Sequence, residues 1–95
     1  MMEITTIVIY DIEDDKVRYR ISEACKDYGL ARIQYSAFSG QLNRNKREEL
    51  YLKISKIIKN KTGKIIIQPV CEKDVKEQKM IDNGKQEGSF SGDEK

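Results

Sequence analysis

The sequence predicts an α+β domain, because stretches typical of β-strands alternate with stretches of helical periodicity. Ile4–Tyr10 is a nearly continuous run of β-branched and other apolar residues, as in a central strand covered on at least one face. Asp14–Tyr28 and Asn43–Lys59 space their apolar residues as one face of a helix. Ala31–Leu42 and Lys64–Cys71 favour extended structure. The predicted order is strand, helix, one or two strands, helix, strand.

The first helix has clear start and stop signals. Glu13 or Asp14 can cap its N-terminus, and Gly29 stands where a glycine commonly ends a helix. The apolar residues between them recur at steps of one, three and four, which places them on one face: Val17, Ile21, Ala24, Cys25 and Tyr28. This face is expected to pack on the sheet.

The middle segment is ambiguous, because Ser36–Gly40 is small and flexible enough for a bend, a bulge or a change of strand. Ala31–Leu42 is therefore either one bent strand or two short ones. Asn43 is a suitable N-cap for the second helix. Leu50, Ile54, Ile57 and Ile58 line the face of that helix that is expected to be buried.

Pro69, the only proline, constrains the last predicted strand. Proline cannot donate a ladder hydrogen bond, so this strand belongs at a sheet edge or Pro69 lies near its end. If the middle segment holds two strands, the order becomes the βαββαβ pattern of a ferredoxin-like sandwich with an antiparallel sheet. Residues 1–82 are expected to form this domain. Lys79–Asp82 is a candidate short strand exchanged in a homodimer, and Asn83–Lys95 has the composition of a disordered tail.

The composition excludes several kinds of chemistry. The 95 residues include no histidine, which removes the usual general base and every histidine metal site. The two cysteines, Cys25 and Cys71, are too far apart in sequence for a zinc motif and are expected to be small buried residues in a reducing cytoplasm. No signal peptide or membrane-spanning run is visible, so a cytoplasmic location is expected. With a net charge of +2, binding to a polyanion requires arranged charges.

Four acids crowd the junction between the first strand and the first helix. Three of them, Glu13, Asp14 and Asp15, are best explained as the start of a helix, where carboxylates favour the positive end of the dipole. Asp11 follows the predicted strand directly and is not needed for the cap. A functional role and a turn-forming role fit Asp11 about equally well on pattern alone.

Arginines and aromatic residues are the other candidates for function. Arg18 and Arg20 are two positions apart on a helix, so they point to different sides. Arg32 opens the middle segment and can lie near the end of the first strand. A guanidinium suits phosphate because its planar fork donates parallel hydrogen bonds. Tyr35 and Phe38 are more typical of core or interface than of base stacking.

These residues carry a resemblance to a known family. The segment IVIYDIEDDKVRYRISEACKDYGLARIQYSAFSGQL resembles the amino-terminal signature of the small universal CRISPR-associated adaptation protein, the second of the two spacer-acquisition proteins. Its most specific parts are YDI after an apolar strand, VRYR on the first helix, and GLARIQYSAFSG. The resemblance covers Ile4 to about Val70. It implies a ferredoxin-like fold, a symmetric homodimer and, for some members, magnesium-dependent endonuclease activity on RNA or DNA in antiviral defence.

The resemblance also implies partners and site residues. The dimer is expected to bridge subunits of the larger adaptation integrase and to hold new spacer DNA. Asp11 matches the metal-binding aspartate, and the positions linked to nuclease activity correspond to Tyr10, Arg18, Arg20, Arg32 and Phe38. The chain departs from the family pattern at Ser39–Gly40–Gln41, where many relatives carry a larger or acidic residue before the glycine and an acid after it.

Magnesium prefers an octahedron of oxygens, so one carboxylate is a poor site. A two-fold axis near the strand ends would bring together Asp11 from each copy.

Two main hypotheses for the function remain at this point. The first is a non-catalytic dimeric scaffold for the integrase, and the second is a metal-dependent phosphodiesterase, an endoribonuclease acting on its own. An unrelated ferredoxin-like domain with a small-molecule site is a third, which the RIQYSAFSG match disfavours.

Overall fold

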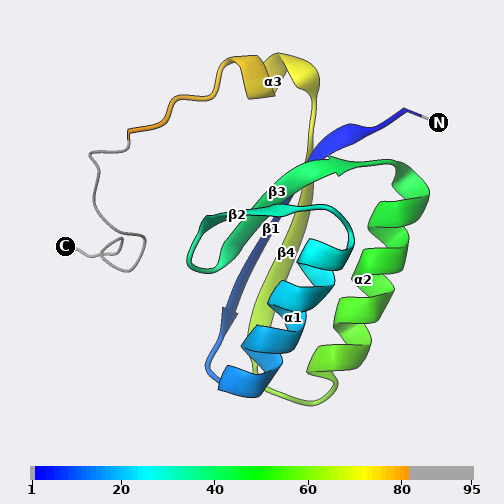
Figure 1. Ribbon diagram of the computed structural model, residues 1–95, viewed down its shortest axis with the longest axis vertical. Coiled ribbons are helices and arrows are strands. Elements are labelled where there is room, and N and C mark those ends of the chain that lie inside the picture. The colour runs from blue at the N-terminus through cyan, green and yellow to red at the C-terminus, as the bar shows by residue number, and fades with distance from the viewer. Residues whose placement is uncertain (1, 82–95) are drawn as a thin grey trace.

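The computed structural model describes residues 2–81. Four strands and three helices follow one another along the chain (Figure 1). In order they are β1 (Ile4–Ile12), α1 (Asp15–Asp27), β2 (Ala31–Gln34), β3 (Ala37–Leu42), α2 (Arg44–Ile58), β4 (Gly63–Val70) and α3 (Glu72–Lys76).

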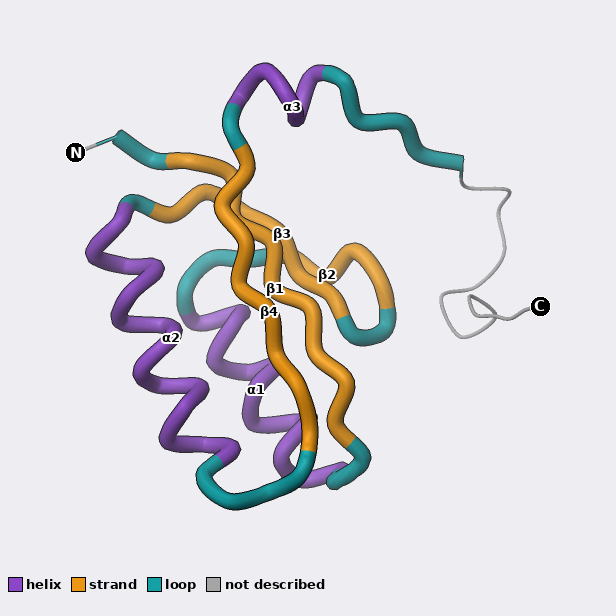
Figure 2. The backbone as a smooth tube through the Cα atoms, turned by 180° about the vertical axis from the view of Figure 1, so that it is seen from behind, coloured by secondary structure: helices purple, strands orange, loops and turns teal. Residues whose placement is uncertain are grey.

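The four strands form one antiparallel sheet in the order β2-β3-β1-β4. This order confirms the ferredoxin-like topology, and it places β4 with Pro69 at an edge, where a missing N–H donor is tolerated. Both long helices lie on the same side of the sheet, and within residues 2–81 no helix covers the opposite face (Figures 1 and 2). We call the two sides the helix-covered face and the helix-free face.

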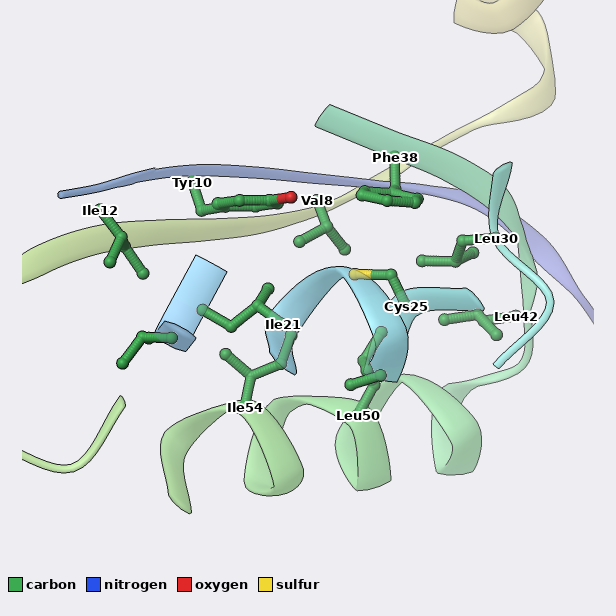
Figure 3. Packing of buried hydrophobic residues seen from close by; sticks show 12 residues of the cluster. Val8, Tyr10, Ile12, Ile21, Cys25, Leu30, Phe38, Leu42, Leu50 and Ile54 are labelled. Carbon is green, nitrogen blue, oxygen red and sulfur yellow. The ribbon is translucent and has the colours of Figure 1, made fainter. Parts of the chain in front are cut away.

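The core lies between the sheet and the two long helices. Alternate residues of β1 point toward the helices, and Val8, Tyr10 and Ile12 are all buried there. Figure 3 shows these side chains packing toward Ile21 and Cys25 of α1. The α2 face contributes Leu50 and Ile54, as its spacing predicts. One apolar stripe from each helix therefore seals the covered face.

The predicted caps are confirmed. The Asp14 carboxylate accepts a hydrogen bond of 3.0 Å from the Val17 amide, and the pKa of Asp14 is lowered first by this bond and then by nearby Lys61. Gly29 follows α1 with a φ of 85°, a conformation that glycine adopts without steric cost. The Asn43 side chain accepts from the Lys46 amide at 2.8 Å and starts α2. Both helices thus begin where their sequence signals place them.

The middle segment forms two strands, one of the two alternatives that its sequence allowed, and the turn between them overlaps the start of the flexible stretch Ser36–Gly40. The chain reverses at Tyr35 and Ser36, between β2 and β3. Gly40 lies inside β3, where a Cβ atom would meet the Leu30 Cδ2 atom at 2.6 Å. Glycine is needed at position 40 for close packing and not for a bend.

The end of β1 also differs from the prediction. The strand continues through Asp11 to Ile12, because the last residues of β1 pair with Gly63 and Lys64 of β4. The turn-forming explanation of Asp11 is therefore wrong. The carboxylate stands on a paired strand, where the ladder hydrogen bonds fix its direction.

The C-terminal region adds one helix that was not predicted, and the exchange of Lys79–Asp82 in a homodimer stays a prediction. The short helix α3 follows β4, whereas the sequence showed no clear pattern there. Lys79–Ile81 form no strand within the described part of this chain, and Asp82 and the predicted tail Asn83–Lys95 lie outside it. Cys25 is buried as predicted, but Cys71 is exposed because it caps α3 at the surface. Within residues 2–81, no helix is long and apolar enough to cross a membrane.

Candidate functional site

Asp11 lies on the helix-free face, near the end of the sheet where β1 meets β4. Its neighbours Tyr10 and Ile12 are buried on the other side, so strand alternation directs the exposed Asp11 away from the helices. Lys64 of β4 is its direct cross-strand partner, and directly opposed residues share a face. The next pair on this face is Ile9 with Ile66. The polar strand end therefore borders an apolar patch.

A single copy of the chain does not complete a magnesium site at Asp11. Among residues 2–81, no group of three or more acidic, cysteine or histidine side chains comes together to hold a metal ion. The direct neighbour of Asp11 in the sheet is a lysine, which repels a cation. Any metal at this position needs oxygen ligands from water, from nucleic acid or from a second copy.

Most of the other predicted site residues gather on the helix-covered side. A cavity of about 190 Å³ opens between the N-terminal half of α1 and the β2–β3 turn. We call it the α1–β2 cavity. It is lined by Tyr10, Asp15, Arg18, Tyr19, Ser22, Arg32 and Tyr35. Three of the six predicted residues, Tyr10, Arg18 and Arg32, therefore share one site, but Asp11 is separated from them by the thickness of the sheet.

Arg18 ties the end of β1 to the start of α1. Its Nη1 atom donates hydrogen bonds of 3.0 Å to the carbonyl oxygens of Ile12 and Glu13. Its Nη2 atom forms an ion pair with Asp15, and its guanidinium lies 5.9 Å from the centre of the Tyr35 ring. The side chain is only 27% exposed. Arg18 thus fixes the backbone immediately after Asp11 as well as lining the cavity.

Arg32 holds the opposite wall. Its guanidinium lies over the Phe38 ring at 4.9 Å and donates to the Tyr35 carbonyl oxygen. Phe38 is fully buried and stacks on Tyr10 with 6.4 Å between ring centroids. Burial raises the pKa of the Tyr10 phenol, and the Arg32 charge opposes this rise. Phe38 therefore supports the cavity from below and does not line it.

The prediction that Arg18 and Arg20 point to different sides is confirmed, because Arg20 is exposed and does not line the cavity. The sequence interpretation missed Asp15, Tyr19 and Ser22 as site residues. Together with Arg18 they follow one another at steps of three, one and three, which places all four on one face of a helix. This spacing is the sequence signal that could have identified them. Tyr35 was expected in core or interface, but it is exposed in the turn beside the cavity.

Comparison with known proteins identifies a family and individual relatives that this chain resembles. Residues 2–78 match the family of CRISPR associated protein Cas2. A relative from Desulforudis audaxviator, named CRISPR-associated endoribonuclease Cas2, is 51% identical over 77 residues, covering 81% of this chain and 73% of that protein. A relative from Thermoproteus tenax, named as a CRISPR-associated endonuclease Cas1/endonuclease Cas2 fusion, is 33% identical over 73% of this chain and 26% of its own length.

Solved structures share the fold. A structure titled "Crystal structure of cas2" superposes with a TM-score of 0.73 at 22% identity, over 95% of this chain and 97% of that one. A chain of a "Partial Cas6-RT-Cas1--Cas2 complex" gives 0.71 at 23% identity, over 97% of each chain. Topology and neighbours thus define a small protein with a ferredoxin-like fold. Its sequence match makes the assignment specific: the chain belongs to the CRISPR associated protein Cas2 family.

Proposed function

We propose that this protein serves in CRISPR adaptation as a homodimeric, DNA-binding scaffold for the larger adaptation integrase, and that Asp11 gives it a magnesium-dependent endonuclease activity on RNA or DNA. Family membership supports the adaptation role. A Cas1 partner is supported by the relative in which Cas1 and Cas2 are one fused chain, and by the structurally similar chain in a complex that contains Cas1 and Cas2. The endonuclease activity is supported by the name of the Desulforudis relative.

The main support for a homodimer is the exposed apolar patch on the helix-free face. Ile9 and Ile66 lie side by side in the ladder and are 47% and 46% exposed, although large apolar side chains favour burial. At the edge of this patch stands Asp11, and among residues 2–81 no group of three or more potential metal ligands forms around it. A second copy packed on the same face by two-fold symmetry would cover the isoleucines and supply a second Asp11.

The two carboxylates would hold the magnesium ion of such a dimer. When bound, the ion would supply electrostatic stabilisation of phosphate charge and a more acidic water. The chain itself fixes the direction of the Asp11 side chain. The strand pairing with β4 and the hydrogen bond from Arg18 to the Ile12 carbonyl oxygen restrain the backbone there. We place the scaffold role ahead of a stand-alone endoribonuclease for two reasons. Asp11 lies opposite Lys64 and belongs to no group of three or more potential metal ligands among residues 2–81. In addition, Cas1 and Cas2 are fused in a relative.

The substitution Asp11→Asn separates the two roles. Cleavage of matched RNA and DNA duplexes in magnesium should fall about 100-fold or more, the usual effect of losing a catalytic or metal-holding group. Spacer integration with the integrase should stay within about twofold. Glu48→Gln, which removes an exposed carboxylate on α2, is the matched control. Magnesium-dependent cleavage that survives Asp11→Asn contradicts the nuclease assignment, and loss of integration by a folded Asp11→Asn dimer contradicts a non-catalytic scaffold role.

The dimer is tested by placing a charge in the apolar patch. Ile66→Asp should shift sedimentation from dimer to monomer while leaving the helical circular dichroism spectrum unchanged, because burying an unpaired carboxylate is costly. Tyr51→Asp on α2, where the native side chain is 53% exposed, should leave the dimer intact. A dimer that persists in Ile66→Asp would show that the helix-free face is not the interface.

A further inference from the structure

We propose that the α1–β2 cavity binds one unpaired nucleotide of a nucleic-acid strand, with the base stacked on tyrosine and the phosphate held by arginine. This inference rests on the proposed function in assuming a nucleic-acid ligand, but it concerns a different face from Asp11. The cavity opens on the helix-covered side, whereas Asp11 points to the helix-free side. The two sites can therefore be tested apart.

Exposed aromatic rings form the mouth of the cavity. Tyr19 on α1 is 65% exposed and Tyr35 in the β2–β3 turn is 55% exposed, and both line the opening. The Arg18 guanidinium lies 5.9 Å from the centre of the Tyr35 ring, within the range of a cation–π contact. Proteins that bind single strands present bases with this combination of tyrosine rings and arginine planes.

The charges in the cavity suit one phosphodiester group. Arg18 and Arg32 contribute two positive charges and Asp15 one negative charge, which leaves a net charge of +1. A guanidinium has five N–H donors, and Arg18 directs only Nη1 and one Nη2 donor to protein acceptors. Arg32 donates from Nη1 to the Tyr35 carbonyl. Each arginine thus keeps donors for a phosphate oxygen, while Asp15, whose side chain is 86% exposed, discourages a more highly charged anion.

The polar groups at the cavity wall can recognise a base edge. Ser22 donates its hydroxyl hydrogen to the Tyr19 carbonyl at 2.8 Å, so its oxygen remains available as an acceptor. Tyr10 brings a phenol from β1 to the same cavity. These groups lie on α1 and the central strand β1, which are held by the core. The walls are therefore preformed in the free protein.

The size of the cavity selects against a paired base. A volume of about 190 Å³ is below the range of about 300–1,000 Å³ typical of drug-sized ligands. A single base with its phosphate at the mouth is in keeping with this size, and a base pair is not. A duplex would have to unstack and unpair a nucleotide to enter, so the cavity favours a strand end or overhang over a blunt duplex.

The test compares a fluorescent 20-base-pair duplex carrying a five-nucleotide single-stranded tail with the same duplex made blunt. Binding to the full chain is measured by anisotropy in EDTA. Tyr35→Ala should raise the Kd of the tailed duplex by about 5- to 100-fold, as expected for one lost stacking contact. The Kd of the blunt duplex should change less than twofold. Tyr51→Ala, which removes an equally exposed tyrosine from α2, is the control and should change neither.

A second measurement guards against a folding defect. In ¹⁵N NMR spectra of the wild-type protein, uridine monophosphate should shift the amides of Tyr19, Ser22 and Tyr35, and should leave those of Ile9 and Ile66 in place. Equal weakening of tailed and blunt duplexes by Tyr35→Ala, no weakening of either, or equal effects of Tyr35→Ala and Tyr51→Ala would each overturn the proposal. So would amide shifts that map to the helix-free face.

The result of the duplex-binding test does not depend on the magnesium site. Asp11→Asn should retain the preference for the tailed duplex in EDTA, because Asp11 does not line the cavity. If Asp11→Asn leaves cleavage unchanged while tail selectivity holds, the nuclease assignment fails and the cavity assignment stands. If selectivity for the tailed duplex is absent while Asp11→Asn abolishes cleavage, the cavity assignment fails and the nuclease assignment stands.

Discussion

The two faces of the sheet offer different kinds of surface. The helix-covered face is sealed by α1 and α2 over most of its area, and at its margin it opens into a cavity with arginines, tyrosines and a serine. The helix-free face is open, apolar in the middle at Ile9 and Ile66, and polar at its end at Asp11. The first face offers a cavity formed within one chain, and the second offers an exposed apolar patch beside a carboxylate.

The difference teaches that residues adjacent in sequence serve separate sites. Tyr10 and Asp11 form part of one short motif, but the period of two in a β-strand sends them to opposite faces. The positions grouped by resemblance as one catalytic set therefore divide into Asp11, the cavity residues, the buried support Phe38 and the exposed Arg20. A loss of activity on mutating any of them has a different physical cause in each case.

The largest effect is expected for Phe38→Ala on the helix-covered face. The ring is fully buried beneath Arg32 and against Tyr10, so truncation should lower the free energy of unfolding by about 3–5 kcal/mol. Urea unfolding followed by circular dichroism measures this loss, with Phe38→Leu as the milder control. If Phe38→Ala abolishes nuclease activity without loss of stability, Phe38 acts directly in function and the division between the faces is wrong.

An intermediate effect is expected for Arg18→Gln. Removing the guanidinium leaves the carbonyl oxygens of Ile12 and Glu13 without their donor, which should cost about 1–3 kcal/mol in unfolding free energy. Because this backbone follows Asp11 directly, hydrogen exchange of the amides from Ile12 to Asp14 should also accelerate. Arg20→Gln, an exposed change on the same helix, should stay within about 0.5 kcal/mol. Equal stability of the two variants would contradict the tying role of Arg18.

The smallest effect concerns the reactivity of the Cys25 thiol, which is buried on the helix-covered face. Burial raises the pKa of the Cys25 thiol to about 12, so at pH 7–8 almost none of it is the reactive thiolate. Iodoacetamide should modify exposed Cys71 in the native protein at an ordinary rate and reach Cys25 only on unfolding. Mass spectrometry of the labelled protein counts the two events. Fast native modification of both thiols would mean that the covered face opens readily.

Local signals predicted the fold well because the decisive ones are short-range. The caps at Asp14, Gly29 and Asn43 depend on a few neighbouring residues, and each was recognised from the sequence. Pro69 indicated either an edge strand or a position near a strand end, and β4 meets both conditions because it lies at the sheet edge with Pro69 as its next-to-last residue. The flexible stretch Ser36–Gly40 contains only the second residue of the Tyr35–Ser36 turn. The reason for Gly40, contact with Leu30, arises only in the folded sheet.

The site was only partly predictable for a similar reason. The chemistry of Asp11 and the arginines was visible in the sequence, but their grouping depends on which face each strand residue occupies. The end of β1 was placed at Tyr10, and its continuation through Asp11 follows from pairing with Lys64, a partner 53 positions later in the chain. The cavity needs α1 and the β2–β3 turn to meet, which no local pattern encodes.

The alternation at Tyr10 and Asp11 has an evolutionary consequence. A one-residue insertion or deletion within β1 would reverse the face of every side chain beyond it, placing a carboxylate in the core and a phenol on the open surface. The loop after Ile58 tolerates changes of length without such an exchange. Homologous chains should therefore vary in length at their loops, while the spacing from the start of β1 to Asp11 stays invariant.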